Sequence, residues 1–550
     1  MFIRTSTQKR SDGSTLSHLQ VAESYWDAAK KRSGTRIVWN VGRVDDASTR
    51  ERLEALVKCI HRHLNPDAGV AGRPDWHVVD AWPLGDVWAL EALWKRVGLA
   101  DAITAIVRRS KLSFPVERAL FALVANRAIA PASKLYAHEQ WLREDVRIRG
   151  AENLALHHLY RAMDVLDEHK EHIEEAVFNQ VANLFNLDVE VMFYDTTSLH
   201  FESEAEPGDD DAPDGGLRKR GYSKNGRSDA TQIVVGMAVT RDGFPVRHWV
   251  FPGNTVDVST VKKVREDLRG WKLHRCVFVG DAGMVSADNL RELARGGGRY
   301  IVAVPMTRGG DVVNEVLTRA GRYKTVAENL KVKEVSVGEG ERRQRYVLCH
   351  NPEEEKRQRA HREQVLRELE AELLTLRESG DDEHSKRACA LRASRRFGRY
   401  LKTGRKGGLE LDRAKITDAE KLDGKFVVTT NDDSLTAEDM ALGYKQLLRI
   451  EEAWRRMKSG LDLRPVFHWT EGRIRAHVAI TVHALMLERA AEKLCADTWR
   501  NIRDDLKQVK LVQLSGPEGT IWQATEPNVG ARSRLSKMKI EPPPLIWNLV

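Results

Sequence analysis

The sequence is poor in cysteine and contains no long apolar run. Its 550 residues include five cysteines, and none of them belongs to a Cys-x-x-Cys pair. This pattern indicates neither a zinc site nor a disulfide framework, and such thiols suit a reducing cytosol. No apolar run reaches about 18 residues, so no membrane-spanning segment is expected. The N-terminal stretch MFIRTSTQKR lacks the apolar region of a signal peptide.

The chain also has only a small excess of positive over negative charge. Lys and Arg total 88, and Asp and Glu total 80, which gives a net charge of +8 over the chain. A hydrophobic content of 41% completes the ordinary balance of a soluble protein. The mild basic excess permits a nucleic-acid partner without requiring one. No internal repeat is found, and the length suits about two to four domains.

The N-terminal part divides into two predicted regions. Residues 1–75 form a small α/β unit, with a strand and turn at 36–43 and a helix at 48–63 that Ser48 would cap. Residues 76–188 have a helical pattern almost throughout. This second region is either a scaffold or a DNA-binding module, and it shows no clear helix-turn-helix signature.

From Val189 the pattern changes to short strands separated by helices. An Arg-Asp-Gly sequence at 241–243 predicts a hairpin turn. The resulting order is β, β, β, α, β, α, β, which we assign to residues 189–305 as the first part of an α/β core. The predicted strands are 189–195, 232–240, 244–251, 276–280 and 300–305, and the predicted helices end at about 269 and span 286–295.

An inserted subdomain and a second core segment follow. Residues 306–424 combine strand-like stretches with a charged helix at 354–378, whose leucines repeat at heptad spacing. The repeat is too short for a coiled coil, so packing within this chain is favoured. Residues 425–495 return to the core with a strand at 425–430 and an apolar helix at 473–494, and residues 496–550 form a mixed C-terminal tail.

The stretch from Tyr444 to Ser459 predicts the helix around which the chain is organised. It contains no Gly or Pro and is rich in helix-forming residues. An edge of this helix offers a carboxylate for a metal and cations for phosphate, although Glu451 and Arg455 taken alone fit an ordinary i,i+4 surface pair better. The apolar stripe comprises Leu447, Ile450, Trp454, Met457 and Leu461, and the neighbouring stripe comprises Tyr444, Glu451, Arg455 and Lys458.

Two aspartates upstream add to this set. Asp195 and Asp281 each end a predicted strand, so they converge if the two strands are adjacent, and Glu451 would join them from a helix packed on the sheet. Three carboxylates this close repel one another unless cations are bound. Hard oxygen ligands suit Mg²⁺ or Mn²⁺, and two ions could activate a water or 3′ hydroxyl in phosphodiester chemistry. Alternatively, Asp195 caps a turn through Thr197 and Asp281 caps a helix.

Together these residues resemble the bacterial DDE insertion-sequence transposases. The matching segments are Asp195 in FYDTT, Asp281 in VGDAGM, and the spacing Tyr444-x2-Leu447-x3-Glu451-x6-Lys458. The last is similar to the Y-x2-R-x3-E-x6-K signature of one group in that family. The segments GYSKNGRSD, FPGNTVDVST, TTND, RPVFHW and IRAH also match, so the resemblance covers about residues 190–485.

The resemblance implies a fold, an activity and partners. It implies a ribonuclease H-like mixed-sheet core with 306–424 inserted into it, and cut-and-paste movement of DNA. Asp195, Asp281 and Glu451 would bind Mg²⁺ or Mn²⁺, with two ions expected, while Tyr444 and Lys458 would contact phosphate. The implied partners are double-stranded DNA with terminal inverted repeats and target DNA, bound by a homodimer. The expected location is the cytoplasm, at the nucleoid when bound to DNA.

The chain departs from the family pattern at two positions. Leu447 replaces the signature arginine, and Ala282 follows Asp281 where arginine is common. Arg449 cannot replace the missing cation because it lies about 200° from Glu451 on a regular helix. Arg455 lies one turn after Glu451 and could do so.

A basic segment with interleaved aromatic residues surrounds the predicted site. Its cations would follow phosphates, and its aromatic side chains could stack on unpaired bases. The alternative is a salt-bridged helical surface with buried aromatics. The further DNA-binding candidates are Arg464, His468 and Trp469, together with Lys224 and Arg227 in the earlier basic segment.

Two other functions remain open from the sequence. One is a transposase remnant that binds DNA without catalysis, against which the three intact carboxylates argue. The other is a metal-dependent nuclease that does not join strands and has the same site. The sequence also leaves open whether cleavage passes through a hairpin.

Overall fold

The computed structural model describes most of the chain. The described residues are 2–9, 15–27, 31–64, 76–108, 111–187, 189–202, 216–222, 227, 230–271, 273, 276–306, 310–339, 343–378, 381–404, 408–516 and 519–547. They form two compact units. The first comprises residues 1–82, 509–526 and 543–550, and the second comprises residues 83–508 and 527–542.

The first unit begins with an antiparallel sheet followed by a helix. The sheet contains β1 (Phe2–Lys9), β2 (Thr15–Asp27) and β3 (Arg32–Arg43), and the helix is α1 (Ala47–Leu64). The predicted strand and helix are confirmed, but the predicted Ser48 cap is wrong. The Asp46 carboxylate precedes the helix and accepts the Ser48 backbone N–H at 3.0 Å, because the residue before the first turn is the one that reaches its amides.

The C-terminal tail contributes most of a second sheet in this unit. The sheet has the order β18-β17-β16-β4. Trp82 of β4 and Trp522 of β17 stack with ring centroids 5.2 Å apart. The strands are β4 (His77–Pro83), β16 (Lys510–Gly516), β17 (Gly519–Ala524) and β18 (Ile546–Trp547).

The helical pattern predicted for residues 76–188 is confirmed from Gly85 onward in the second unit, but it is wrong for 77–83, which form β4 of the first unit and pair with β16. The long apolar helix predicted near 473–494 is also confirmed as α16 (Glu471–Cys495), which is buried along most of its length and packs on α4 and α6. None of the helices in the described ranges combines the length and apolar character needed to cross a membrane. The other helices of this region are α2 (Gly85–Arg96), α3 (Leu99–Val107), α4 (Val116–Ile129), α5 (Lys134–Tyr136), η1 (Ala137–Asp145), α6 (Leu156–Glu168), α7 (Lys170–Phe185), α17 (Trp499–Leu506) and α18 (Val529–Met538).

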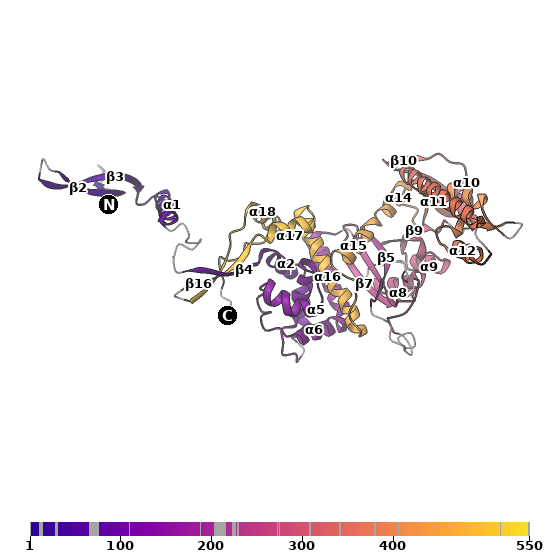
Figure 1. Cartoon of the computed structure of the whole chain (residues 1–550), viewed down its shortest axis with the longest axis horizontal. Helices are drawn as coiled ribbons and strands as arrows, with labels where there is room; N and C mark the ends of the chain where they lie inside the picture. Colours follow the sequence, from indigo (N-terminus) through magenta and orange to yellow (C-terminus); the bar gives the residue numbers. More distant parts are fainter. Residues whose placement is uncertain are drawn as a thin grey trace. The chain divides into compact units, whose positions relative to one another are not determined.

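A nine-stranded mixed sheet forms the centre of the second unit (Figure 1). Five of its strands have the order β9-β8-β5-β6-β7, in which β5, β8 and β9 are parallel and β6 and β7 are antiparallel to their neighbours. This arrangement confirms the predicted ribonuclease H-like mixed sheet. The strands are β5 (Val191–His200), β6 (Gln232–Thr240), β7 (Pro245–Pro252), β8 (Val277–Gly280) and β9 (Arg299–Val304), with the helices α8 (Asp257–Gly270), η2 (Ala282–Met284) and α9 (Ala287–Ala294) between them.

Strands from the predicted insertion extend this sheet beyond β9. The added order is β10-β11-β12-β15, joined to β9 through β15. β12, from the region 306–424, pairs antiparallel with β15 over its whole register. Backbone hydrogen bonds therefore join this part of the insertion to the core sheet. These elements are α10 (Gly310–Thr318), β10 (Lys324–Ala327), β11 (Leu330–Val337), β12 (Gln344–His350) and β15 (Lys425–Thr430).

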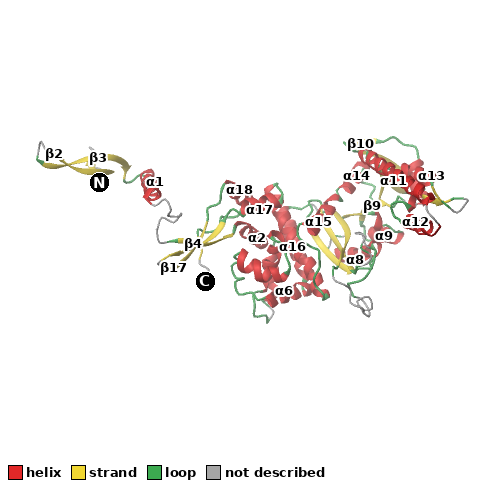
Figure 2. Cartoon of the chain, viewed as in Figure 1, coloured by secondary structure: helices red, strands yellow, loops and turns green. Residues whose placement is uncertain are grey.

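The remainder of that region forms a separate cluster, which we name the α11–α13 subdomain (residues 352–421; Figure 2). Leu369, Leu373 and Leu376 of α11 are buried in it with Tyr400 and Leu401, so the heptad-spaced leucines pack within the chain as predicted. Its elements are α11 (Pro352–Glu378), α12 (Asp381–Ala393), η4 (Gly398–Tyr400), β13 (Leu401–Thr403), β14 (Leu409–Leu411) and α13 (Arg413–Lys421).

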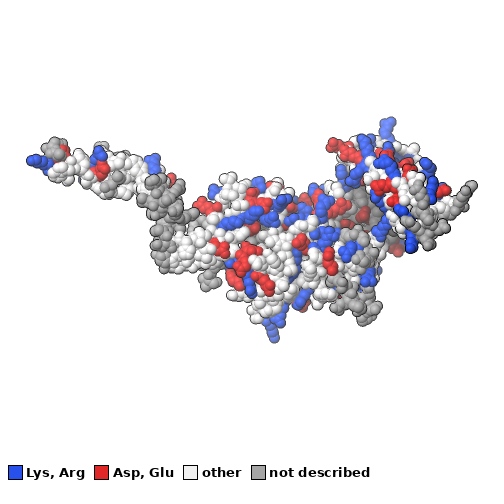
Figure 3. Space-filling model, in the orientation of Figure 1, with Lys and Arg blue, Asp and Glu red and all other residues white. Residues whose placement is uncertain are grey.

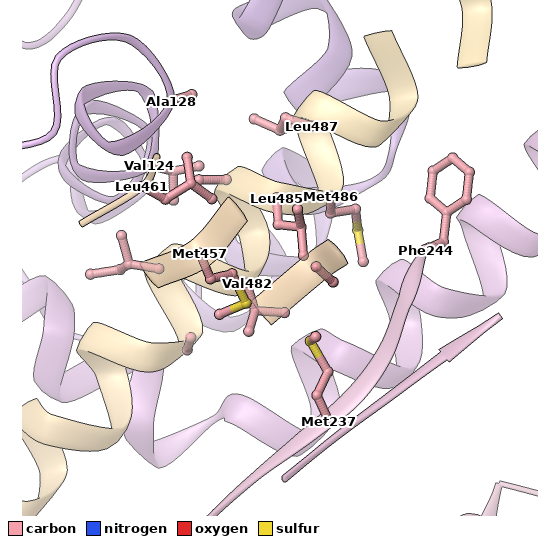
Figure 4. Close-up of a cluster of buried hydrophobic side chains, with 14 of the residues drawn as sticks. Val124, Ala128, Met237, Phe244, Met457, Leu461, Val482, Leu485, Met486 and Leu487 are labelled. Carbon is pink, nitrogen blue, oxygen red and sulfur yellow. The ribbon is translucent and has the colours of Figure 1, made fainter. Parts of the chain in front are cut away.

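Helices cover both faces of the sheet. On one face, α8 and α9 bury Met192, Tyr194 and Phe278. On the other face lie α16 and the two helices of the signature region, α14 (Ala437–Lys445) and α15 (Leu448–Ser459). Figure 4 shows how side chains of α4, α15 and α16 meet those of β6 in one apolar cluster that includes Val124, Met457, Val482 and Met237. The helical region and the sheet therefore share a core, which fixes α15 above β5.

Candidate active site

Asp195 and Asp281 lie at neighbouring positions of two parallel strands. The register pairs Phe193 with Val279 and Tyr194 with Gly280, so Asp195 and Asp281 are the next pair along. Phe193 and Val279 both face the core under α14–α16. Because side chains alternate along a strand, the two aspartates that follow them by two residues face the same helices. Asp281 keeps extended backbone angles, φ −79° and ψ 166°, beyond the end of β8.

The prediction that both aspartates end their strands is correct only for Asp281. Asp195 lies in the middle of β5, which continues to His200. The physical reason is that β5 has two partners of different length. Its parallel partner β8 stops at Gly280, whereas its antiparallel partner β6 pairs with it as far as His200.

The signature region is two helices and not the single helix predicted. α14 ends at Lys445 and α15 begins at Leu448. At the joint the backbone amides bond three residues back, with Leu447 N–H to Tyr444 O at 2.9 Å and Ile450 N–H to Leu447 O at 3.1 Å. This tighter winding changes the rotation per residue, so Tyr444 does not share a regular helical stripe with Glu451.

The side chain of Tyr444 lies near all three carboxylates. Its hydroxyl donates a hydrogen bond to Asp281 Oδ1 at 3.1 Å. Burial raises the pKa of Tyr444 well above its usual value, and the negative charges of Asp281, Glu451 and Asp195 raise it further. The phenol therefore lies within electrostatic range of all three acidic residues. Tyr444, Leu447, Leu448 and Glu451 also line one cavity of about 240 Å³.

The apolar stripe of α15 is confirmed, and its polar edge is exposed. Leu447, Ile450, Trp454, Met457 and Leu461 are all buried. Glu451 lies in the exposed first turn of α15, and Arg455 is exposed one turn later. The ion pair that would make them an ordinary surface pair is not formed within the described residues, whereas Arg449 pairs with Glu452 at 3.3 Å.

The remaining predicted DNA-binding residues have varied environments. Lys458 and Arg464 are half-buried, and Trp469 is 55% exposed with the Arg218 guanidinium 4.3 Å from its ring centroid. Burial lowers the pKa of His468 to about 3, with further lowering from the cations Lys134, Arg127 and Arg473. Arg227 is exposed, and Lys224 lies outside the described residues.

The segments that follow the signature helix have a structural role that the sequence did not reveal. Lys134 is buried, and its Nζ donates to His477 Nδ1 at 2.7 Å. His477 Nε2 donates in turn to the carbonyl of Leu463 at 3.0 Å. His477 of the IRAH segment therefore fastens the loop before RPVFHW to the helical region.

The donor chemistry of the site fits a hard divalent cation, but the complete ligand set is not assembled. Asp195 and Asp281 supply carboxylate oxygens of the kind that Mg²⁺ and Mn²⁺ prefer. Among the residues that the structure describes, no three Asp, Glu, His or Cys side chains are grouped closely enough to hold one ion. The strand register puts Asp195 next to Asp281, while these two and Glu451 are not grouped closely enough to hold an ion together.

Asp257 is a fourth carboxylate that sequence reasoning missed. It lies in the first turn of α8 and accepts a hydrogen bond from the hydroxyl of Thr196, the residue after Asp195. A Cβ atom at Gly283 would lie 3.3 Å from Asp257 Oδ2, so only a small residue fits there comfortably. Asp257 thus contacts the residue after Asp195 and lies close to Gly283, two residues after Asp281. Asp257 belongs to the segment FPGNTVDVST, and the family match of that segment could have pointed to it.

The alternative that Asp281 caps a helix is only partly realised. Asp281 occupies the N-cap position of the short η2 helix, yet its side chain makes no capping hydrogen bond. Its carboxylate is instead used by Tyr444. The fold and the site together define the class: a ribonuclease H-like protein with one aspartate within its central strand, a second just beyond the end of the adjacent parallel strand, and a glutamate on a late helix.

Comparison with known proteins then identifies the family. The chain belongs to the family described as "Transposase DDE domain", which it matches over residues 190–487. Residues 3–70 match the "IS1634 family transposase, N-terminal domain". The insertion-sequence DDE transposase resemblance is therefore confirmed, and this family implies dependence on a divalent metal.

The chain is also similar in structure to a solved transposase complex. One similar solved structure is the cryo-EM structure of a piggyBac transposase synaptic complex with hairpin DNA. It has 11% sequence identity and a TM-score of 0.32, with coverage of 83% of this chain and 81% of that chain. No curated protein matches.

Proposed function

We propose that this chain cuts and joins the ends of an insertion sequence through divalent-metal chemistry at Asp195, Asp281 and Glu451. The observation that carries this proposal is the strand register that puts Asp195 beside Asp281, with Tyr444 hydrogen-bonded to the second. Two bound ions would supply orientation and charge stabilisation for in-line displacement at phosphorus. The protein would act as a homodimer on double-stranded DNA with terminal inverted repeats and on target DNA.

Each residue has a distinct task in this scheme. Asp195 and Asp281 present oxygen ligands from rigid strands, and the Tyr444 hydroxyl holds the Asp281 carboxylate in one orientation. Glu451 completes the ligand set from α15 when DNA and metal bind. The joint at 446–447 is where α15 can adjust relative to α14, because the regular i,i+4 ladder is interrupted there.

A cleavage and joining assay tests the proposal. Purified protein is incubated with Mg²⁺, labelled DNA carrying the inverted repeats that flank its gene, and a target plasmid. We expect cleavage at the repeat ends followed by insertion into the plasmid. Cleavage without insertion would favour a nuclease, and end binding without cleavage would favour a DNA-binding remnant.

Tyr444→Phe tests the link between the phenol and Asp281. The substitution keeps the ring and removes the hydroxyl that orients the carboxylate. We expect the Mg²⁺ concentration that half-saturates cleavage to rise about 10- to 100-fold, the usual cost of losing a partner that orients a metal ligand. Tyr136→Phe, at an exposed tyrosine of α5 that does not line this cavity, is the control. An unchanged Mg²⁺ dependence for Tyr444→Phe would contradict the role.

Arg455→Ala tests whether this cation replaces the arginine missing at Leu447. Arg455 is exposed one turn after Glu451, where it can reach the phosphate beside the cut. We expect weaker binding of cleaved ends and a salt dependence that is flatter by about one unit of slope. Arg449→Ala is the matched control, because Arg449 is already paired with Glu452. If the salt dependence of binding has the same slope for Arg455→Ala and the wild type, Arg455 does not contact the phosphate.

A further inference from the structure

The net positive charge of the chain is concentrated in one stretch. Residues 386–415 contain eleven Lys and Arg against Glu410 and Asp412, a net charge of +9. The whole chain carries only +8, so the rest of the sequence is close to neutral. A local excess of this size is the electrostatic signature of a surface that binds a polyanion.

These cations lie on the outside of the α11–α13 subdomain. Leu391, Tyr400 and Leu401 pack inward, which turns the neighbouring side chains toward solvent. Figure 3 shows Lys and Arg side chains over this part of the chain, with Asp and Glu side chains among them. We define the basic surface by its exposed members, which are Lys386, Arg392, Arg395, Arg396, Arg399, Lys402, Arg413 and Lys415.

Within the part of the chain that the structure describes, few of these charges have acidic partners. Arg396 pairs with Glu368 of α11 at 2.6 Å, and Lys415 approaches Asp412 at 3.8 Å. The Arg399 guanidinium lies 4.7 Å from the ring centroid of Tyr400, an uncharged partner. Most of the positive charge therefore remains available to a ligand.

The basic surface continues toward the candidate active site. The Arg395 guanidinium lies 5.5 Å from the ring centroid of Tyr222. Tyr222 lines a cavity of about 1090 Å³ whose walls include Asp257, Ala282 and Gly283, and the last two directly follow Asp281. Through the contact of Arg395 with Tyr222, the basic surface therefore adjoins a cavity whose wall includes the two residues that follow Asp281.

We propose that the basic surface binds the sugar-phosphate backbone of duplex DNA without reading its sequence. The proposal rests on the proposed function, since it assigns a path to the DNA whose end reaches Asp195 and Asp281. Tyr400 is buried and Phe397 half-buried, so these rings do not present an exposed stacking platform for bases. Arginine is well suited to phosphate because its planar guanidinium bonds two oxygens at once.

The test compares two charge-matched variants of the full-length protein. The first changes Arg392, Arg395 and Lys402 to Gln. The second changes Arg357, Arg359 and Arg367 of α11 to Gln, which removes the same charge from exposed positions of the same subdomain. Arg357 and Arg359 are already paired with Glu354 and Glu355, at 2.8 and 3.0 Å. Binding of a repeat-end duplex and of a scrambled duplex is measured across a salt series, and thermal melting checks the fold.

We expect only the first variant to lose binding. Its affinity should fall about 10- to 100-fold for both duplexes, with a salt slope about three units flatter. Equal losses in both variants would mean that net charge alone matters, and a loss confined to the repeat-end duplex would mean that the surface reads bases. Unchanged affinity of the first variant for both duplexes would also overturn the proposal. If the wild type binds neither duplex, the proposed function fails as well.

Discussion

Glu451→Gln is expected to bind repeat ends normally and to lose cleavage. The substitution keeps the shape of the side chain but removes the charge that would hold a cation. Loss of a ligand to the catalytic ions should slow cleavage more than about 1,000-fold, equivalent to about 4 kcal/mol of transition-state stabilisation. Because Glu451 is exposed in the first turn of α15, the fold should be unaffected.

The measurement pairs end binding with single-turnover cleavage in Mg²⁺. Glu452→Gln is the control, because Glu452 is the next residue on the same helix and only pairs with Arg449. Cleavage at the wild-type rate by Glu451→Gln would show that Glu451 is not the third ligand.

Glu174→Ala is expected to lower the free energy of unfolding by about 3–5 kcal/mol, the cost of leaving buried charges without their partner. Glu174 of α7 is buried, accepts from Lys170 Nζ at 2.7 Å and contacts His248 of β7. It therefore joins the helical region to the sheet that carries Asp195. Glu171→Ala is the control, since Glu171 is exposed and its pair with Arg247 should contribute less than about 1 kcal/mol.

This stabilisation should depend on pH in a defined direction. Burial alone would raise the pKa of Glu174, but Lys170 and His248 outweigh it and hold the pKa well below its usual value. A carboxyl with a lowered folded pKa stabilises the fold above its unfolded pKa and loses that effect as the pH falls. Urea unfolding at about pH 7 and about pH 4 should therefore show the deficit of Glu174→Ala shrinking in acid. A deficit that is constant with pH would indicate lost packing instead.

Local patterns were sufficient for most of the secondary structure. The alternation of short apolar runs and turn residues located β6, β7, β8 and β9, and the Arg-Asp-Gly turn ends with Gly243 at φ +80°, a conformation that glycine adopts freely. The stripe through Ile450 and Met457 identified the buried side of α15. These features depend on neighbouring residues, so a single sequence carries them.

The joint between α14 and α15 could not be read from local propensity. No Gly or Pro occurs between Tyr444 and Ser459, and most residues of this stretch favour a helix. The tertiary contacts place Tyr444 against Phe426 and Asp281 while Ile450 and Trp454 enter the main core. One straight helix would not place Tyr444 against Phe426 and Asp281 and at the same time place Ile450 and Trp454 in the main core.

The sequence by itself determined the chemistry, and the tertiary structure decided which groups meet. The motifs around Asp195, Asp281 and Glu451 predicted the candidate carboxylates, because the order and spacing of those motifs together are specific. Only the register of β5 against β8 puts the two aspartates side by side, and only the fold brings Tyr444 to Asp281, since strand pairing and packing join residues far apart in sequence. The same holds for the contact between Arg395 and Tyr222, because no local pattern records which surfaces a folded chain brings together.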